Sequence, residues 1–411
     1  MSTNWLRQNE ISGALLCLLF LSQILPAYIM WAFSCMIIIL NLGLKRGRIR
    51  MWRMPGSCPF WILFVLGVVM AVISNRVQFF SWLVFRDIVR MLYIPTYWYL
   101  ACITCYREKC DYRVLYKTFY LFAGLLCGYE LFFRLLNYVQ NMNVQMIFRT
   151  FVSQGMVNEF VIALATFLVF FKPECNRGYY LSKKMDRLFN IIIISSFALS
   201  FSRTSFLILA LLILMVGLKN AKATVKVAFV GAIAAILVVI LLPGIVSTFI
   251  DKIEFSSVEV LSNRTYWDNA SIVHGWRGYE VFCAKETYSG FSYLNKIFGG
   301  GFGTTVDVHG YAFLVTSEEM LPYLHNGYYT NLVKFGVLGI VITIAYFASY
   351  LLFCKRNSWG DYNSRLTIAL SVSLIITMFF IHGIFWGQAS LVISIPFAWA
   401  VMRNSYREKQ N

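Results

Sequence analysis

The sequence predicts an all-α polytopic membrane protein with about twelve transmembrane helices and one long loop subdomain on one side of the membrane. Two observations lead to this fold class: the composition, and the alternation of apolar runs with basic loops. Of the 411 residues, 59% are hydrophobic and only 13% are charged, whereas soluble domains have about 25% charged residues. The composition therefore excludes a soluble enzyme, a disordered chain and a secreted disulfide scaffold.

The apolar runs give the order of the predicted helices, and most are close to the length of about 20 residues that a spanning helix needs. The runs occupy residues 11–25, 27–44, 60–74, 88–106, 116–136, 156–172, 188–202, 204–218, 226–248, 328–354, 365–386 and 387–402. The first run lacks a small-residue cleavage site, so we expect a retained helix rather than a signal peptide. The expected organisation is helices 1–9 in residues 1–248, a loop subdomain in 249–327, and helices 10–12 with a tail in 328–411.

The net charge of +17 comes from 36 Lys and Arg against 19 Asp and Glu. Basic residues follow every second apolar run, in clusters at 45–53, 107–117, 172–187, 219–226, 355–365 and 403–409. This alternation is what the positive-inside rule predicts, and it assigns both termini to the cytoplasm. The charge is thus explained by topology, and no nucleic-acid partner is expected.

A second set of cations falls on the opposite, outer side, and almost all of them are arginines. A guanidinium stays charged when partly buried, and its planar fork binds phosphate through two hydrogen bonds. The set predicts a shared anion site, with ion pairing to nearby acidic residues or to lipid phosphates as the alternative. Its members are Arg76, Arg86, Arg90, Arg134, Arg149, Arg203, Arg264 and Arg277.

Two positions in this region favour chemistry most clearly. Arg203 lies between two apolar runs with almost no loop, flanked by Ser202 and Ser205, and a charge at that depth is costly unless it faces a polar cavity or a partner. Snorkelling to the headgroups is the alternative. His325 precedes the tenth run at the outer membrane boundary, where a histidine can act as a general base or can simply hydrogen-bond at a helix start.

No metal site is predicted. Cys102 and Cys105 form a C-x-x-C pair, but no second ligand pair lies near them in the sequence. The glycine-rich stretch at 299–303 resembles a phosphate-binding loop in composition and lacks the Lys-Ser/Thr that follows in a P-loop. We therefore expect a flexible turn that lets the external loop fold over the membrane.

Three short motifs resemble the O-antigen ligase/polymerase family. Residues 325–339 match its H-N-x9-G-x-x-G signature, and the Ser-Arg step at 202–203 is similar to its Ser-Arg at the outer end of a mid-chain helix pair. The Arg-Gly-Tyr-Glu segment at 277–280 resembles its Arg and Tyr/Trp-Glu segment. Together the motifs cover roughly residues 188–340. Their order along the chain, with a long loop before the tenth run, makes the combination specific.

The resemblance implies a GT-C-like glycosyltransferase that needs no metal or cofactor. Its donor would be an oligosaccharide linked to undecaprenyl pyrophosphate, at the periplasmic face of the bacterial inner membrane. His325 would activate the acceptor hydroxyl, while Arg203 and Arg277 would bind the pyrophosphate as catalytic residues. Further substrate-binding residues are expected at the following positions: Arg264, Arg86, Arg90, Asn326 and Tyr279.

Three functions remain open at this point. A polymerase would join lipid-linked repeat units of O-antigen, capsule or exopolysaccharide, whereas an O-antigen ligase would move the glycan to the lipid A core. The polymerase is preferred because polymerases are more numerous and varied, and a chain-length regulator is its candidate partner besides membrane lipid. A transporter of lipid-linked glycans would predict cations along the spans and two repeated halves, and the sequence contains neither.

Overall fold

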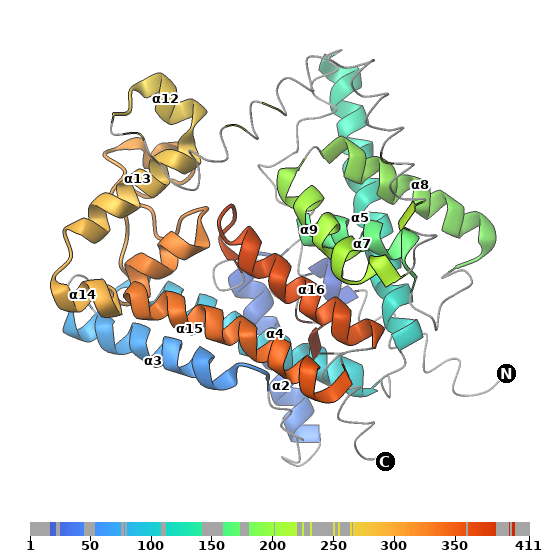
Figure 1. The fold of residues 1–411 in the computed structure, drawn as a ribbon, viewed down its shortest axis with the longest axis horizontal. Coiled ribbons are helices and arrows are strands. Elements are labelled where there is room, and N and C mark those ends of the chain that lie inside the picture. The colour runs from blue at the N-terminus through green and yellow to red at the C-terminus, as the bar shows by residue number, and fades with distance from the viewer. Residues whose placement is uncertain are drawn as a thin grey trace.

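The polypeptide forms α-helices joined by turns throughout the part of the chain that the computed structural model describes (Figure 1). The described residues are 17–21, 25–44, 54–74, 78, 80–107, 112–141, 159–172, 181–200, 202–219, 224–225, 231, 250, 254, 264, 266–358, 361–383, 394 and 397–398. The helices are α2 (Ala27–Leu44), α3 (Ser57–Ile73), α4 (Trp82–Arg107), α5 (Tyr112–Asn141), α7 (Glu159–Phe170), α8 (Lys183–Ser200), α9 (Arg203–Met215), η2 (Gly217–Lys219), α12 (Asn269–His274), α13 (Trp276–Ser289), α14 (Tyr293–Phe298), η3 (Tyr311–Leu314), α15 (Gly327–Ser358) and α16 (Tyr362–Thr377).

The predicted apolar runs coincide largely with helices wherever these residues are described, with two corrections, at the run 365–386 and at the run 328–354, whose helix α15 is interrupted at Gly336. The run 365–386 extends beyond α16, which ends at Thr377 and continues into a turn at 378–382. The turn forms because the carbonyls of Met378 and Phe379 accept hydrogen bonds from the start of α15 instead of continuing a helix. The run 226–248 and most of 387–402 lie outside the described residues.

Within the described ranges, two helices are long and apolar enough to span a membrane, at Leu115–Gln140 and Gly327–Lys355. Shorter apolar helices occur at Tyr28–Leu40, Ser57–Ile73, Glu159–Phe170 and Arg203–Met215. The all-helical fold of the described residues agrees with a membrane protein, and the count of about twelve spans stays a prediction.

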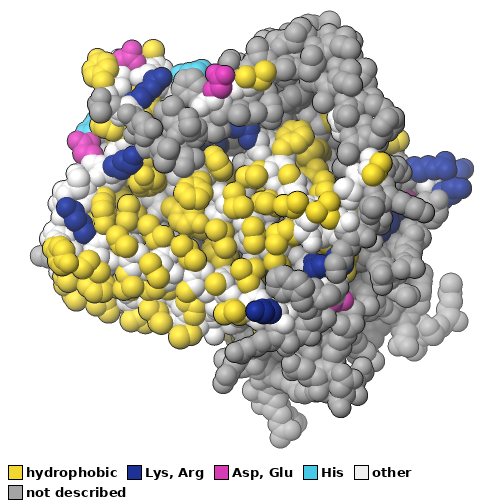
Figure 2. Space-filling model, viewed as in Figure 1, with side chains coloured by type: hydrophobic (Ala, Val, Ile, Leu, Met, Phe, Trp, Pro, Cys, Tyr) yellow, Lys and Arg dark blue, Asp and Glu magenta, His cyan; other side chains and the backbone are white. Residues whose placement is uncertain are grey.

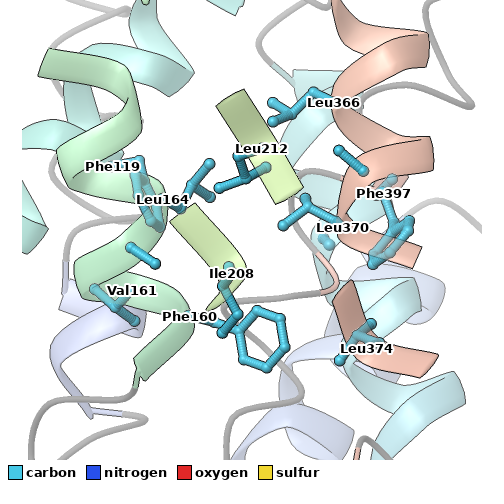
Figure 3. Packing of buried hydrophobic residues seen from close by; sticks show 14 of the residues in the cluster. Phe119, Phe160, Val161, Leu164, Ile208, Leu212, Leu366, Leu370, Leu374 and Phe397 are labelled. Atoms are coloured by element: carbon cyan, nitrogen blue, oxygen red, sulfur yellow. The ribbon is translucent and has the colours of Figure 1, made fainter. Parts of the chain in front are cut away.

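The main hydrophobic core lies between α5, α7, α9 and α16 (Figure 3). Along α9, Ile208 and Leu212 lie between the side chains of α7 and those of α16, where Leu374 and Leu366 lie at opposite ends of the contact. All four side chains are at most 2% exposed. The order of the labelled residues along each helix shows that α9 and α16 are antiparallel, so the start of α9 lies at the same end of the bundle as the end of α16.

Polar contacts sort the helices into two ends of one bundle. At one end, Tyr362 at the start of α16 donates a hydrogen bond to the carbonyl of Phe171 just after α7 (2.7 Å), and Lys172 pairs with Asp186 in α8 (2.7 Å). The final turns of α2, α4, α7 and α15 all lead to this end, where the described basic residues Lys172, Lys184 and Lys355 lie. The other end holds the starts of α4, α9 and α15, together with residues 266–326.

The surface over α3 and α15 is broadly apolar (Figure 2). These two helices pack against each other, and on α3 the side chains of Trp61, Val65 and Val72 remain 46%, 56% and 58% exposed. On α15, Val341 is 57% exposed. An apolar surface of this extent is expected where lipid replaces water.

Residues 266–326 form a small helical unit with a hydrophobic core of its own. Its core includes Ile272 of α12, Tyr279 and Cys283 of α13, and Val308. Val333 of α15 also belongs to this cluster. The unit is therefore fixed to the first turns of α15, opposite the end of the bundle that holds Lys172.

Candidate active site

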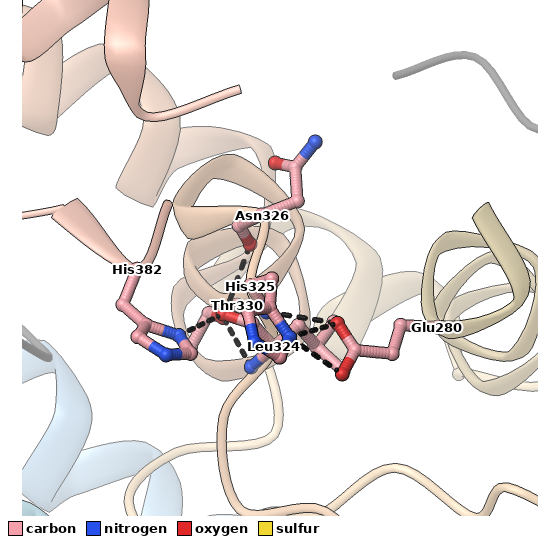
Figure 4. Close-up of polar contacts among 6 residues, drawn as sticks. All are labelled: Glu280, Leu324, His325, Asn326, Thr330 and His382. Atoms are coloured by element: carbon pink, nitrogen blue, oxygen red, sulfur yellow. Dashed lines mark hydrogen bonds and ion pairs between the residues drawn. The ribbon is translucent and has the colours of Figure 1, made fainter. Parts of the chain in front are cut away.

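The center of the site is a histidine held by a buried carboxylate (Figure 4). Glu280 of α13 has a side chain only 2% exposed, and both of its oxygens lie close to His325 Nδ1, at 2.9 and 3.0 Å. The backbone N–H of His325 also donates to Glu280 Oε2 (2.9 Å). Because a buried carboxylate needs hydrogen-bond donors, this contact fixes both the ring and the backbone of His325.

The contact also determines which ring nitrogen can react. An ionised carboxylate only accepts hydrogen bonds, so the proton of a neutral His325 ring lies on Nδ1. Nε2 then carries the lone pair and can accept a proton from a hydroxyl group. The imidazole is 32% exposed while its partner is buried, which gives the geometry of a general base supported by an orienting acid.

Asn326 fixes the start of α15 directly after His325. Its side-chain oxygen accepts hydrogen bonds from the backbone N–H groups of Tyr328 (3.1 Å) and Tyr329 (3.2 Å), which is N-cap geometry. Its Nδ2 donates to the carbonyl of Phe379 in the turn after α16 (3.0 Å). These contacts give Asn326 a structural role, and direct substrate binding by this residue stays a prediction.

A second imidazole lies beside the first. The rings of His325 and His382 are 4.8 Å apart, and His382 Nδ1 donates to the carbonyl of Leu324 at 2.5 Å. His382 lies in the turn beyond α16, where burial and then the neighbouring His325 lower its pKa to about 4. At neutral pH it is therefore uncharged and holds the backbone that precedes His325.

Arg90 of α4 reaches the same cluster through an aromatic ring. Its guanidinium lies 3.9 Å from the ring center of Tyr323, a cation–π contact. The Tyr323 ring in turn meets His382 edge-on at 5.1 Å. A predicted substrate-binding arginine is thus linked by ring contacts to the predicted base.

The glycine-rich segment is buried and tightly packed, unlike the flexible turn that the sequence predicts. Gly300 and Gly301 donate backbone hydrogen bonds to Val333 and Lys334 of α15 (both 2.9 Å). A Cβ at Gly301, where φ is +83°, would lie 2.1 Å from the backbone of Ala71 in α3. The glycines are required because the loop passes between α3 and α15 without room for side chains.

A buried ion pair fixes the end of this segment to α4. Lys334 Nζ lies 2.5 Å from Asp87 Oδ2 and 2.8 Å from the carbonyl of Thr304. The same Asp87 oxygen accepts from the backbone N–H of Gly303 (2.7 Å). Both charged side chains are at most 1% exposed, so the pair joins α4, α15 and the glycine-rich segment at the base of the site.

The two arginines predicted to be catalytic lie at the same end of the bundle as His325. Arg277 is half-buried on α13, three residues before Glu280 and so on the same helix face. Arg203 is half-buried at the first position of α9, after the N-cap Ser202. Since α9 is antiparallel to α16, the start of α9 lies at the same end of the bundle as the end of α16.

The remaining predicted residues have other surroundings. Arg86 pairs with Glu318, and Arg264 is exposed with its guanidinium 5.6 Å from the Trp267 ring. Tyr279 is 3% exposed, and burial raises its pKa. Their binding of substrate stays a prediction.

For Arg134 the alternative of ion pairing is correct. Its side chain is 1% exposed, pairs with Glu130 and donates to the carbonyl of Leu199 (2.8 Å). Arg76 and Arg149 of the predicted outer set lie outside the described residues.

Sequence reasoning missed Tyr323 as a member of the site, and it assigned no role to Glu280 although this residue ends the Arg-Gly-Tyr-Glu segment. The sequence gives one indication of Glu280, because this acid follows Arg277 on one helix face. Its partner, His325, is however 45 positions away along the chain. Among the described residues, no three His, Cys, Asp or Glu side chains come together as a metal site.

The helical bundle, its apolar surface and this polar site define an integral membrane protein with a candidate acid–base center. Residues 188–344 match the family model described as O-antigen ligase, which includes the segments that carry Arg203, Arg277 and His325. The match confirms the resemblance to the O-antigen ligase/polymerase family, whose members are glycosyltransferase-like enzymes acting on lipid-linked polysaccharides. No curated protein matches the chain.

Proposed function

We propose that the protein is a polymerase that joins lipid-linked repeat units of a bacterial surface polysaccharide at the periplasmic face of the inner membrane. In this proposal it is a GT-C-like enzyme with about twelve spans and cytoplasmic termini. The observation that carries the proposal is the His325–Glu280 pair, with its imidazole one-third exposed (32%), at the bundle end where the arginines lie.

The reaction would proceed by proton removal and displacement. The acceptor hydroxyl gives its proton to His325 Nε2, and Glu280 stabilises the imidazolium that forms. The acceptor oxygen bonds to the anomeric carbon of the donor as the bond from that carbon to the diphosphate oxygen breaks. Attack from the opposite side inverts the anomeric center.

The arginines would stabilise the leaving group. Negative charge grows on the diphosphate as its bond breaks, and Arg203 and Arg277 would bind that charge through bidentate hydrogen bonds without a metal. One such preorganised contact contributes a factor of about 10²–10³ in rate. Arg86, Arg90 and Arg264 would hold the rest of the lipid-linked substrates.

The decisive experiment is incubation of the purified protein with synthetic undecaprenyl-pyrophosphate repeat units alone. Polymerase activity gives a ladder of elongated glycans, whereas the His325→Ala and Arg203→Ala variants give none while they remain in the membrane fraction. A wild-type protein that leaves the single units unchanged contradicts the proposal.

A ligase is the second candidate, favoured by the description of the matching family model as O-antigen ligase. It would transfer glycan only when a lipid A core is added. In cells, a deletion strain would then accumulate polymer on the carrier lipid, whereas loss of a polymerase leaves one capped unit. A chain-length regulator, if it binds, would change the length distribution of the ladder without being required for elongation.

A further inference from the structure

Only part of the Arg86 guanidinium is paired with other groups of the described chain. Its side chain is 11% exposed, and Nη1 pairs with Glu318. Nε and Nη2 are buried and have no hydrogen-bond partner in the described part of the chain. Buried N–H groups without partners are costly, and in a charged group they mark a position where a ligand completes the hydrogen bonds.

The surroundings of Arg86 favour an anion. The neighbouring Asp87 is occupied through one oxygen by Lys334 and by the backbone N–H of Gly303. Its other oxygen is buried without a partner among the described residues, but the buried lysine balances its charge. The guanidinium of Arg90, one helical turn later, adds a second cation and contacts Tyr323. Glu318 is the carboxylate that pairs with Arg86.

The Glu318 side chain is more exposed to solvent than the Arg86 side chain and is therefore freer to move. It is 40% exposed, and Glu318 lies in the segment between η3 and the bridge at Leu321. A carboxylate bound to a guanidinium imitates the oxygens of a phosphate group. Moving Glu318 away would leave Arg86 with a full set of donors for one phosphate or diphosphate.

We propose that Arg86 is a binding site for a phosphate or diphosphate group, and that Glu318 is an internal competitor which such a group displaces. The inference rests on the proposed function only for the identity of the natural ligand. It assigns Glu318 a regulatory role, because the empty site is kept neutral until substrate arrives.

The start of α4 suggests how the group is delivered. Phe80, Trp82 and Phe85 come just before Arg86 and are 97%, 65% and 55% exposed. Apolar side chains beside a cation suit an anion that is attached to a lipid. A free phosphate would gain nothing from them, so the two sources can be separated.

The test is calorimetric titration of the full-length protein in detergent with inorganic pyrophosphate and with farnesyl diphosphate. Glu318→Gln should tighten pyrophosphate binding about fivefold, the size expected for loss of one half-exposed ion pair. Glu319→Gln removes the same charge one position away and should leave the affinity unchanged. Arg86→Lys should weaken binding, and in the Arg86→Ala/Glu318→Gln double variant the tightening should be absent.

Equal effects of Glu318→Gln and Glu319→Gln, or tightening that persists without Arg86, would overturn the proposal. Tighter binding of farnesyl diphosphate, lost selectively in Phe85→Ala, assigns the site to a lipid-linked anion, and equal binding of both probes assigns it to free phosphate. The titration contains no glycan, so its result does not depend on whether the protein polymerises repeat units.

Discussion

The imidazole of His325 depends on a carboxylate from another helix, and this dependence can be measured. Glu280→Gln keeps the size of the side chain and removes the charge that fixes the Nδ1 proton and stabilises the imidazolium. We expect turnover to fall by a factor of about 10²–10⁴, the range of general-base assistance, with little change in substrate affinity. Initial rates of glycan elongation over a range of donor concentrations provide the measurement.

The chain offers a matched control on the same helix. Glu286, also on α13, pairs with His309 Nε2 at 2.8 Å, but both side chains are about half exposed. Glu286→Gln should therefore leave the elongation rate near that of the wild type. An equal loss in both variants would show that α13 needs its charges for folding rather than for catalysis.

The second histidine predicts a dependence of stability on pH. The pKa of His382 is lowered from 6.5 to about 4 in the folded protein, first by burial. Between these values the folded state binds fewer protons at this position than the unfolded state. The contribution of His382 to stability is therefore complete above pH 6.5 and is lost as the pH falls toward 4.

His382→Gln tests this assignment because a glutamine can still donate to the carbonyl of Leu324 but does not titrate in this range. The thermal midpoint in detergent should fall less steeply between pH 6.5 and about pH 4 in the variant than in the wild type. Identical slopes would mean that other groups account for the acid sensitivity.

Individual residues of the site show which of its features can be predicted from the sequence and which cannot. His325 and Arg277 could be selected because motif spacing and residue chemistry are local properties, and both lie at the same end of the bundle. The partnership with Glu280 and the ring contact with His382 could not be predicted, because they depend on how α13, α15 and the turn after α16 pack together.

At the scale of elements, α15 is interrupted at Gly336, where φ is +66° and ψ is −165°. The break admits α14, since the carbonyl of Ile297 would lie only 2.3 Å from a Cβ at this position. The first glycine of the H-N-x9-G-x-x-G motif thus has a structural reason in this chain. Sequence analysis predicted one continuous run at 328–354, because a single glycine among apolar residues gives no signal of a kink.

Gly336→Ala should therefore disturb the docking of α14 and the glycine-rich segment. Positive φ with ψ near −165° is a region that essentially only glycine occupies, so a residue with a Cβ there is penalised by about 1–3 kcal/mol, and the contact with Ile297 adds to it. Gly310 also has a positive φ, of +84°, but its ψ of −1° lies in the ordinary left-handed region and nothing lies within 4 Å of its Cβ position, so it shows the cost of a positive φ without a clash. Thermal unfolding in detergent should show a larger loss for Gly336→Ala than for Gly310→Ala. Equal losses would mean that α14 can move away from the added side chain at no cost in stability.

Over the described part of the molecule, Lys172, Lys184 and Lys355 lie at the end of the bundle where α7 and α15 end and α8 and α16 begin, while the topology predicted from charge stays a prediction. The charge alternation was accessible from sequence because Lys and Arg positions need no tertiary information. The closeness of residues 266–326 to α15 was not accessible, since it depends on a separate core that includes Val333. This arrangement indicates the side of the membrane on which the site lies only when the positive-inside rule is applied to it.

Cysteine labelling tests that side directly. Tyr293, 82% exposed on α14, lies on the unit that carries Glu280, and the exposed Lys184 lies at the start of α8 near the basic end. Each is replaced by cysteine after Ser replaces Cys17, Cys35, Cys58, Cys105, Cys110 and Cys175, while the buried Cys102, Cys127, Cys283 and Cys354 stay in place. A membrane-impermeant maleimide should label Tyr293→Cys in intact spheroplasts and Lys184→Cys only after lysis. The opposite pattern would put His325 in the cytoplasm, where a donor presented at the periplasmic face could not reach it.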